Sequence, residues 1–258
     1  MAEKPESTAS LVKIYRYPVK GLSPESLQST ALVKDQTLPF DRAFAIENGT
    51  GKFDPRQPKY LPKVNFLMLM RNEKLALLKT RFDDDSQVLT IELEGEPVAS
   101  GALDTSEGRD VIERFMADYM TDDLRGAPRI VHAPGHSFSD VAAKCLHVIN
   151  MASVRELEKM MGQPIDPLRF RANLIIDGGA PFSELDQVGK TLASDDVSLK
   201  IFKRTMRCPA TNVDPEQGVR DRTIPDFLFE HFGHRDFGIY ANVTKSGQLA
   251  TGAEFIIS

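Results

Sequence analysis

Short segments in which apolar and polar residues alternate recur through the first part of the chain, separated by turn-forming residues. Alternation places every second side chain on one face of a strand. It is clearest at residues 88–93, where leucine or isoleucine occupies positions 89, 91 and 93. Further strands are expected at residues 11–17, 26–33, 42–47, 64–70 and 74–80. Closely spaced strands with few helices between them favour a β-barrel or a β-sandwich.

The second part of the chain mixes strands with a few helices. Residues 108–120 carry apolar side chains at helical spacing, and the polar segment 121–126 after them marks an expected domain boundary. Ser153 and Glu156 have the spacing of a capping box at the start of a second helix. Strands are expected at 129–132, 146–149, 173–176, 197–203, 238–244 and 254–257, and helices at 153–161 and 223–232. The predicted class is α+β, mainly β, with a few peripheral helices.

Composition narrows the possible functions. The chain has 258 residues and a formal net charge of −5, which does not favour a nucleic-acid partner. No run approaches the roughly 20 apolar residues of a membrane span, and the polar start of the chain lacks a signal region. The two cysteines, Cys145 and Cys208, do not suggest a disulfide framework, although a single bridge stays open. We therefore expect a cytoplasmic protein without a membrane or nucleic-acid partner.

Cys208 stands just after the predicted strand 197–203, in a loop with basic residues around it. Lys203, Arg204 and Arg207 precede it closely. Nearby positive charge lowers the pKa of a thiol and favours the thiolate, which attacks electrophiles or binds soft metals. The alternative is a structural cysteine, because cysteine packs as a small hydrophobe. That second interpretation suits Cys145, which lies in an apolar segment and is expected in the core.

Basic and polar residues also gather at three other turns or strand ends, at residues 17–21, 40–42 and 169–173. Arginine suits bidentate contacts with phosphate, and lysine acts as a point charge. Taken singly, each is more simply a solvated surface charge, and Asp140 is interpreted as a solvated turn residue. No glycine-rich dinucleotide motif or phosphate loop is present. A proline and a glycine between His132 and His136 oppose a shared helical metal site.

Six short motifs occur in a fixed order along the chain. They are Tyr-Pro-Val-Lys at 17–20, Asp-Arg at 41–42, Phe-Arg-Ala-Asn at 170–173, Pro-Phe-Ser-Glu at 181–184, Arg-Cys-Pro at 207–209 with Val-Asp-Pro at 213–215, and Phe-Gly-Ile-Tyr at 237–240. From about residue 11 onward the sequence resembles the MOSC-domain proteins that begin with a MOSC N-terminal β-barrel region. This group includes the mitochondrial amidoxime-reducing component and bacterial relatives. The resemblance implies a β-barrel-like N-terminal domain at 11–125, a MOSC β-barrel domain at 126–258, and a cofactor in the cleft between them.

The resemblance also implies a molybdenum cofactor, in which a pterin dithiolene and a protein cysteine hold the metal. Cys208 matches that cysteine and is therefore the expected metal ligand and catalytic residue. The positions expected to bind the pterin and its phosphate are Lys20, Gly21, Arg42, Ser153, Arg171, Asn173, Arg207 and Tyr240. For Ser153, a role as a helix N-cap is equally open, and Asp214 is expected to orient the cysteine loop. Gly21 departs from a serine that is common in the family but keeps its backbone N–H, and Gln187 stands where the family usually has a tryptophan.

The expected activity is reduction of N-hydroxylated or other N-oxygenated small molecules. The sequence ends with the MOSC region, without the ferredoxin-like extension of some bacterial relatives. Electrons are therefore expected from a separate flavoprotein, iron–sulfur protein or haem carrier. The alternative is a sulfur carrier or cofactor-handling protein in which Cys208 carries a persulfide. A binding module that has lost catalysis is a third possibility, and the retained cysteine and basic groups argue against it.

Overall fold

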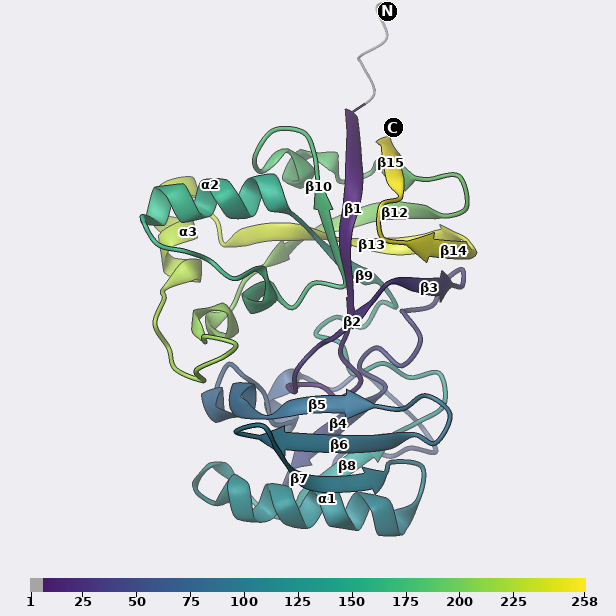
Figure 1. Cartoon of the computed structure of the whole chain (residues 1–258), viewed down its shortest axis with the longest axis vertical. Helices are drawn as coiled ribbons and strands as arrows, with labels where there is room; N and C mark the ends of the chain where they lie inside the picture. Colours follow the sequence, from purple (N-terminus) through teal and green to yellow (C-terminus); the bar gives the residue numbers. More distant parts are fainter. Residues whose placement is uncertain (1–6) are drawn as a thin grey trace, which may run out of the picture.

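The computed structural model describes residues 7–258, and a closed β-barrel forms the upper part of the molecule in Figure 1. The strands follow one another in the order β10 (Leu174–Asp177), β9 (Leu146–Asn150), β13 (Asp236–Lys245), β12 (Ser198–Met206), β11 (Thr191–Ala193), β15 (Glu254–Ile257) and β1 (Ser7–Arg16). β1 also pairs with β10, which closes the ring of seven strands. The prediction of a mainly β protein built on a barrel is confirmed.

Alternating apolar side chains fill the barrel. Val197, Leu199 and Ile201 are fully buried on one side of β12 and its approach, as the sequence pattern predicts. They share a core with Ile239 and Val243 of β13. Burying one such side chain contributes about 1.5–3 kcal/mol, so the barrel is a firm scaffold for the loops at its ends.

The first three strands of the chain belong with the C-terminal half. β1 lies between β10 and β15, β2 (Glu25–Leu27) pairs with β1, and β3 (Ser29–Leu32) pairs with β14 (Gly247–Ala250). The strand expected at 26–33 is thus two short strands with different partners. The division of the chain at residue 125 stays a prediction about the sequence, since in space the barrel draws strands from both sides of it.

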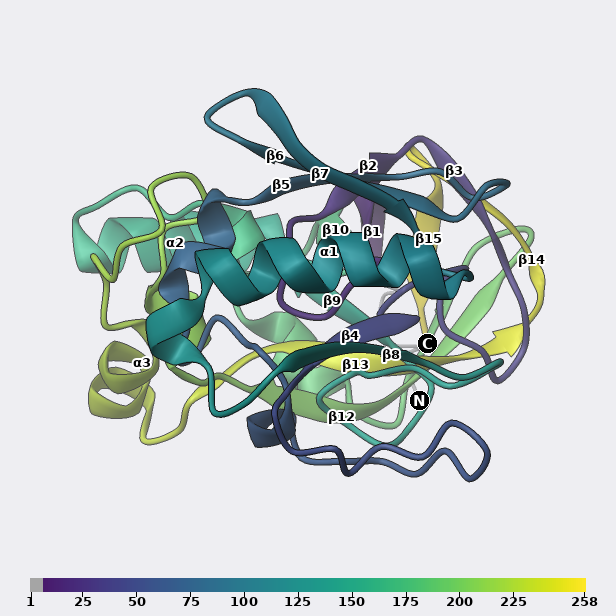
Figure 2. The same cartoon turned by 90° about the horizontal axis from the view of Figure 1, so that it is seen from below.

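The remaining N-terminal residues form a second body below the barrel (Figure 1). β4 (Phe44–Asn48) pairs with β8 (Pro128–His132), while β5 (Lys79–Phe82), β6 (Val88–Leu93) and β7 (Glu96–Ala102) form a second small sheet. Helix α1 (Ser106–Tyr119) packs against β7 and β8, and Figure 2 shows it crossing the underside between the two sheets. Ile112 and Met116 of this helix are fully buried in the separate core of this body.

The strand expected at 64–70 is wrong. Residues Lys63–Asn65 form a short 3-10 helix, η1, and turns follow it. Two asparagines bond to the local backbone: Asn65 Nδ2 donates to the Pro62 carbonyl at 2.8 Å, and Asn72 Oδ1 accepts from the Met68 N–H at 3.1 Å. Such contacts compete with strand pairing. Likewise, Glu73–Leu77 is a 3-10 helix, η2, and the strand after it begins only at Lys79.

Helices α2 (Met151–Met161) and α3 (Ile224–Phe232) pack on the outside of the barrel. α2 connects the parallel strands β9 and β10. The N-cap of α2 is Asn150, whose Oδ1 accepts from the Ala152 N–H at 3.0 Å, so the predicted capping box of Ser153 and Glu156 is wrong. Within residues 7–258, no helix combines the length and the apolar composition needed to cross a membrane.

Candidate cofactor site

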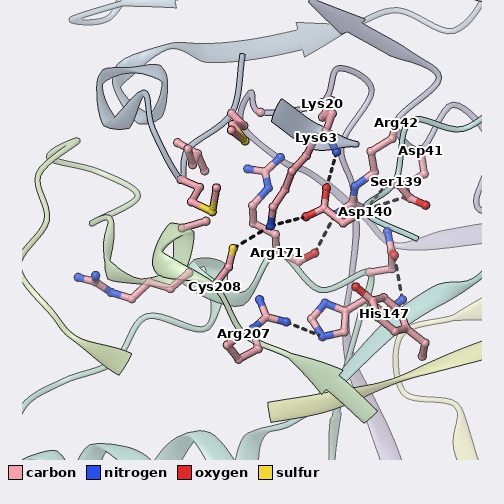
Figure 3. Close-up of a pocket in the computed structure, with 18 of the residues that line it drawn as sticks. Lys20, Asp41, Arg42, Lys63, Ser139, Asp140, His147, Arg171, Arg207 and Cys208 are labelled. Carbon is pink, nitrogen blue, oxygen red and sulfur yellow. Dashed lines mark hydrogen bonds and ion pairs between the residues drawn. The ribbon is translucent and has the colours of Figure 1, made fainter. Parts of the chain in front are cut away.

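A cavity lies where the N-terminal body meets the barrel, and Figure 3 shows the side chains that line it. Its empty space is about 820 Å³, part of it open to solvent at the mouth. Two carboxylates, Asp41 and Asp140, face six basic side chains in its wall. The basic residues are Lys20, Arg42, Lys63, Arg169, Arg171 and Arg207. This excess of positive charge favours an anionic ligand.

Cys208 lies at this cavity, two residues beyond the end of β12. It is the N-cap of a 3-10 helix, η6 (Pro209–Asn212), and its carbonyl accepts hydrogen bonds from the Thr211 N–H at 3.1 Å and from Thr211 Oγ1 at 3.0 Å. These bonds fix the backbone at the cysteine. The side chain is partly exposed and lines the cavity, so its sulfur is open to a ligand instead of being packed in the core.

Cys145 lines the same cavity but is buried, as the sequence predicts. Burial raises the pKa of its thiol to about 12, so the group is neutral at physiological pH. Both cysteines are free thiols, so they do not form the single disulfide bridge that the sequence leaves open. The two thiols therefore differ in exposure within one site.

A lysine from the N-terminal body reaches the cysteine. Lys63 Nζ lies 3.2 Å from Cys208 Sγ and 3.5 Å from Asp140 Oδ2. Asp140 also pairs with Lys20. Partial desolvation by the surrounding protein opposes the charged form of Asp140, but Lys20 and Lys63 hold the pKa of the carboxyl well below its usual range. Burial also opposes the charge of Lys63, yet Asp140 and then Cys208 raise its pKa, so Lys63 is an ammonium at neutral pH. The interpretation of Asp140 as a simple solvated turn residue is wrong.

Two arginines enclose the ring of Tyr17. The guanidinium carbons of Arg42 and Arg171 each lie 4.2 Å from the ring centroid, and both arginines have left-handed backbone, with φ of 50° and 53°. Such strain persists only where the surrounding structure imposes it. Arg42 Nη1 lies 2.7 Å from both oxygens of Asp41, whereas within the described residues no carboxylate pairs with Arg171. Burial lowers the pKa of Arg171 to about 10, so it keeps its charge and faces the cavity without a counter-ion.

Neutral acceptors orient Arg207. Its Nη1 donates to His147 Nε2 at 3.1 Å and its Nη2 donates to the Phe170 carbonyl at 2.7 Å. Burial, and then the positive charge of Arg207, hold the pKa of His147 well below its usual value, so the imidazole is neutral. Gly238 lets β13 approach this histidine, since a Cβ at that position would lie 3.0 Å from Nε2 and 2.6 Å from the Val148 carbonyl oxygen. The charge of Arg207 is left for a ligand.

Arg169 anchors the cysteine loop (residues 207–221). It is 4% exposed and extends from a 3-10 helix, η4 (Pro167–Phe170). Its Nη atoms donate to Asp214 Oδ2 at 2.8 Å and to the two oxygens of Asp221 at 2.8 and 3.0 Å. The other oxygen of Asp214 accepts from the backbone N–H groups of Glu216 and Gln217. This geometry supports the expectation that Asp214 orients the loop.

Eight of the predicted site residues line this one cavity. They are Lys20, Gly21, Arg42, Arg171, Asn173, Arg207, Cys208 and Tyr240. Asn173 has both ends of its amide bonded to backbone, Nδ2 to the Tyr15 carbonyl and Oδ1 to the His147 N–H, so it shapes the wall. Gly21, at φ +89°, lets the backbone pass the Leu67 carbonyl oxygen, which would lie 3.0 Å from a Cβ.

The structure does not bring Ser153 to the cavity. Its side chain is fully buried near the start of α2, and its Oγ lies 2.8 Å from both carboxyl oxygens of Glu184. Ser153 Oγ also accepts from the Phe182 N–H at 2.7 Å. The hydroxyl is thus fully engaged inside the protein and holds the turn at 182–184 against α2.

The Glu184 carboxyl predicts a pH dependence of stability. Burial raises its pKa to about 7 from the usual 4.5. Below about pH 4.5 the carboxyl is protonated in both states. Between that pH and 7 the unfolded chain releases the proton first, so stability falls as pH rises. The loss is on the order of 3 kcal/mol at most. We expect Glu184→Gln to remove it, measured as the free energy of unfolding in denaturant at pH 5 and pH 8. A difference between wild type and variant that is equal at both pH values would contradict this.

Three residues that line the site are not predicted as site residues from the sequence: Lys63, Asp140 and His147. Lys63 follows no motif, and its place beside Cys208 depends on contact between segments far apart in the sequence. His147 is a polar residue within the apolar strand 146–149, and that mismatch is the one signal that marks it in advance. Asp140 carries no such signal.

The donor set fits an anionic ligand that brings its own metal. Within residues 7–258, no group of three or more His, Cys, Asp or Glu side chains is placed to hold a metal ion. A metal at Cys208 would therefore need further coordinating atoms from a ligand, as a dithiolene provides. Arg171 lacks a counter-ion in the described chain, and the Nε atoms of Arg169 and Arg207 are buried without hydrogen-bond partners there. These donors suit a bound anion.

Each half of the chain matches a known domain family. Residues 8–123 match the model of the MOSC N-terminal beta barrel domain, and residues 133–255 match that of the MOSC domain. Mitochondrial amidoxime reducing component 2 of Rattus norvegicus is 29% identical over 119 residues, which are 42% of this chain and 35% of that protein. Molybdenum cofactor sulfurase of Drosophila erecta is 26% identical over 251 residues, which are 89% of this chain and 31% of that protein. The matches thus span about a third of either relative's length. The crystal structure of the YUAD protein from Bacillus subtilis superposes with a TM-score of 0.45 and 13% identity, covering 97% of this chain and 95% of that one.

Proposed function

Because the chain belongs to the MOSC-domain proteins that begin with a MOSC N-terminal β-barrel domain, we propose that it is a molybdenum-cofactor oxidoreductase. The proposed reaction is reduction of an N-hydroxylated compound, in which R–NH–OH takes up two electrons and two protons and gives R–NH2 and water. The observation that carries the proposal is the meeting of one open thiol, Cys208, with an uncompensated arginine, Arg171, in a single cavity. A partner protein, such as a flavoprotein, iron–sulfur protein or haem carrier, would supply the electrons.

Each group of the site has a part in this proposal. Cys208 would hold the metal through its sulfur, while Arg171, Arg207 and Lys20 would hold the pterin and its phosphate. Tyr17 keeps the Arg171 guanidinium extended by stacking on it. When bound, the cofactor supplies a two-electron redox centre with a position open to substrate. The cavity walls then limit access of water to that position.

The second candidate is a sulfur carrier, supported by the relatives named molybdenum cofactor sulfurase. Here Cys208 would carry a persulfide, and the Lys63 ammonium 3.2 Å from the sulfur would stabilise its negative charge. The basic cavity would then bind the cofactor as a transient guest. The same residues serve both candidates, so a chemical measurement must separate them.

Protein made in a host that synthesises the cofactor provides that measurement. We expect stoichiometric molybdenum and pterin, together with reduction of an amidoxime to the amidine when a chemically reduced viologen donates electrons. An unmodified Cys208 in the intact mass spectrum should accompany this. Protein with no molybdenum but with an added sulfur atom on Cys208 would replace the oxidoreductase proposal with the carrier. Metal and pterin without any reduction of N-hydroxylated compounds would contradict the proposed reaction while leaving cofactor binding intact.

A further inference from the structure

Lys63 is the side chain of the N-terminal body that touches the cysteine, and the cofactor assignment gives it no part. It extends from η1, and its Nζ contacts Cys208 Sγ at 3.2 Å and Asp140 Oδ2 at 3.5 Å (Figure 3). An ammonium has three N–H donors. Among residues 7–258 these two atoms are its hydrogen-bond partners, so one donor is left for a ligand in the cavity.

The charges around Lys63 do not balance. Asp140 serves both Lys20 and Lys63, and Lys20 is the deeper of the two, with 9% of its side chain exposed against 27% for Lys63. Arg42 is matched by Asp41, and Arg169 by the two aspartates of the cysteine loop. The Cys208 sulfur is the other anionic group beside Lys63. Once that sulfur is committed to a metal, one carboxylate for two ammonium groups leaves positive charge at the cysteine end of the cavity.

The position of Lys63 indicates that this positive charge lies at the part of the cavity where a substrate would bind. A group in contact with Cys208 Sγ lies beside the atom that would hold the metal, and hence beside the reacting atoms. Asp140 is 45% exposed, and its carbonyl accepts from the hydroxyl of Tyr60, itself 44% exposed. This end of the cavity is therefore its mouth, through which a substrate enters.

We propose that Lys63 is a substrate-recognition residue that binds a carboxylate on the substrate. The class of substrate is then an N-hydroxylated compound with a carboxylate near its N–O group, in preference to a neutral one. This inference rests on the proposed function for the reaction itself, but the anion subsite can be tested without it. The ammonium donates to the carboxylate oxygens, and Asp140 keeps Lys63 directed toward the mouth.

The kinetic test compares benzamidoxime with its 4-carboxylate derivative, with rates expressed per molybdenum. In Lys63→Met, kcat/KM for the carboxylate substrate should fall by about tenfold or more, as expected for loss of a hydrogen bond between charged groups. The neutral substrate should change far less, and Lys63→Arg should restore most of the preference. Lys59→Met is the matched control, because Lys59 is an exposed lysine of the same segment outside the cavity. Equal losses for both substrates in Lys63→Met would overturn the proposal.

A second readout uses full-length protein from a host that does not make the cofactor. Calorimetric titration with benzoate should show binding that Lys63→Met weakens by about tenfold or more, while the control variant Lys59→Met retains it. Unchanged benzoate binding in Lys63→Met, or an equal loss of binding in Lys59→Met, would overturn the subsite. If this cofactor-free protein binds benzoate through Lys63 but protein from a host that makes the cofactor holds no molybdenum, the subsite stands and the proposed function fails.

Discussion

Replacing Cys208 with alanine is expected to lower the molybdenum content of the purified protein by more than about tenfold, and reductase activity with it. Within the described residues Cys208 has no neighbouring group of side chains that can hold a metal in its place. Loss of an outer hydrogen-bond partner already lowers metal affinity about 10–100-fold, so loss of the protein's own ligand should cost at least as much. The pterin content should fall less, because the arginines and Lys20 are unchanged in the variant. Molybdenum by elemental analysis and pterin by fluorescence provide the two measurements.

Cys145→Ala is the matched control for this experiment. Cys145 is the other thiol of the chain, but it is buried and neutral. We expect that variant to retain its molybdenum. Full metal occupancy in Cys208→Ala would remove the ligand role, and equal loss in both variants would point to damage of the cavity wall rather than to a metal–sulfur bond.

Arg169→Met is expected to lower the free energy of unfolding by about 3–5 kcal/mol, the cost of removing one partner from a buried ion pair. Arg169 has 2% of its side chain exposed and bonds to Asp214 and Asp221. Among the described residues, its removal leaves Asp214, 19% exposed, without an arginine partner and leaves Asp221, 28% exposed, with Arg222 alone. The cysteine loop should loosen at the same time, because both aspartates belong to it. Urea unfolding measures the first effect, and hydrogen exchange of residues 209–221 measures the second.

Arg155→Met offers a matched control on the surface. Arg155 also makes two hydrogen bonds to one aspartate, Asp177, but its side chain is 54% exposed. Exposed ion pairs contribute little, so this variant should be much closer to wild type. Similar destabilisation in the two variants would mean that the burial of Arg169 is not the source of its effect.

The alternation of apolar and polar residues predicts strands that have one buried face, but it predicts few of the other elements. The alternation at 197–201 fixes the inward face of β12 because those side chains fill the barrel. It fails at 64–70, where a run of buried residues, Phe66 to Met68, is held in turns by asparagine side chains. A run of apolar residues indicates that the segment is buried. A buried segment need not be a strand. β7, β11 and β14 are missed because they are edge or short strands without an apolar stripe.

Site residues that belong to a recognisable sequence motif can be predicted. Residues that reach the site only through contacts between distant segments cannot. Arg42, Arg171 and Cys208 come from motifs and meet in the cavity. Ser153 comes from a helix-start pattern, but its hydroxyl is used by Glu184 inside the protein. Lys63 has no sequence signal, because its importance comes from a contact with a residue 145 positions away.

β1 leaves the ribosome long before two of the strands that pair with it in the barrel. β2 can pair with residues 14–16 early, but the edge that faces β10 has no partner until residues 174–177 have emerged, and residues 7–10 wait for β15 at 254–257. An unpaired strand edge invites pairing with the wrong chain. The nascent protein must therefore keep the open edges of β1 from other strands until β10 and then β15 have been made. Conditions that slow translation should increase aggregation of this chain more than of a barrel made from consecutive strands.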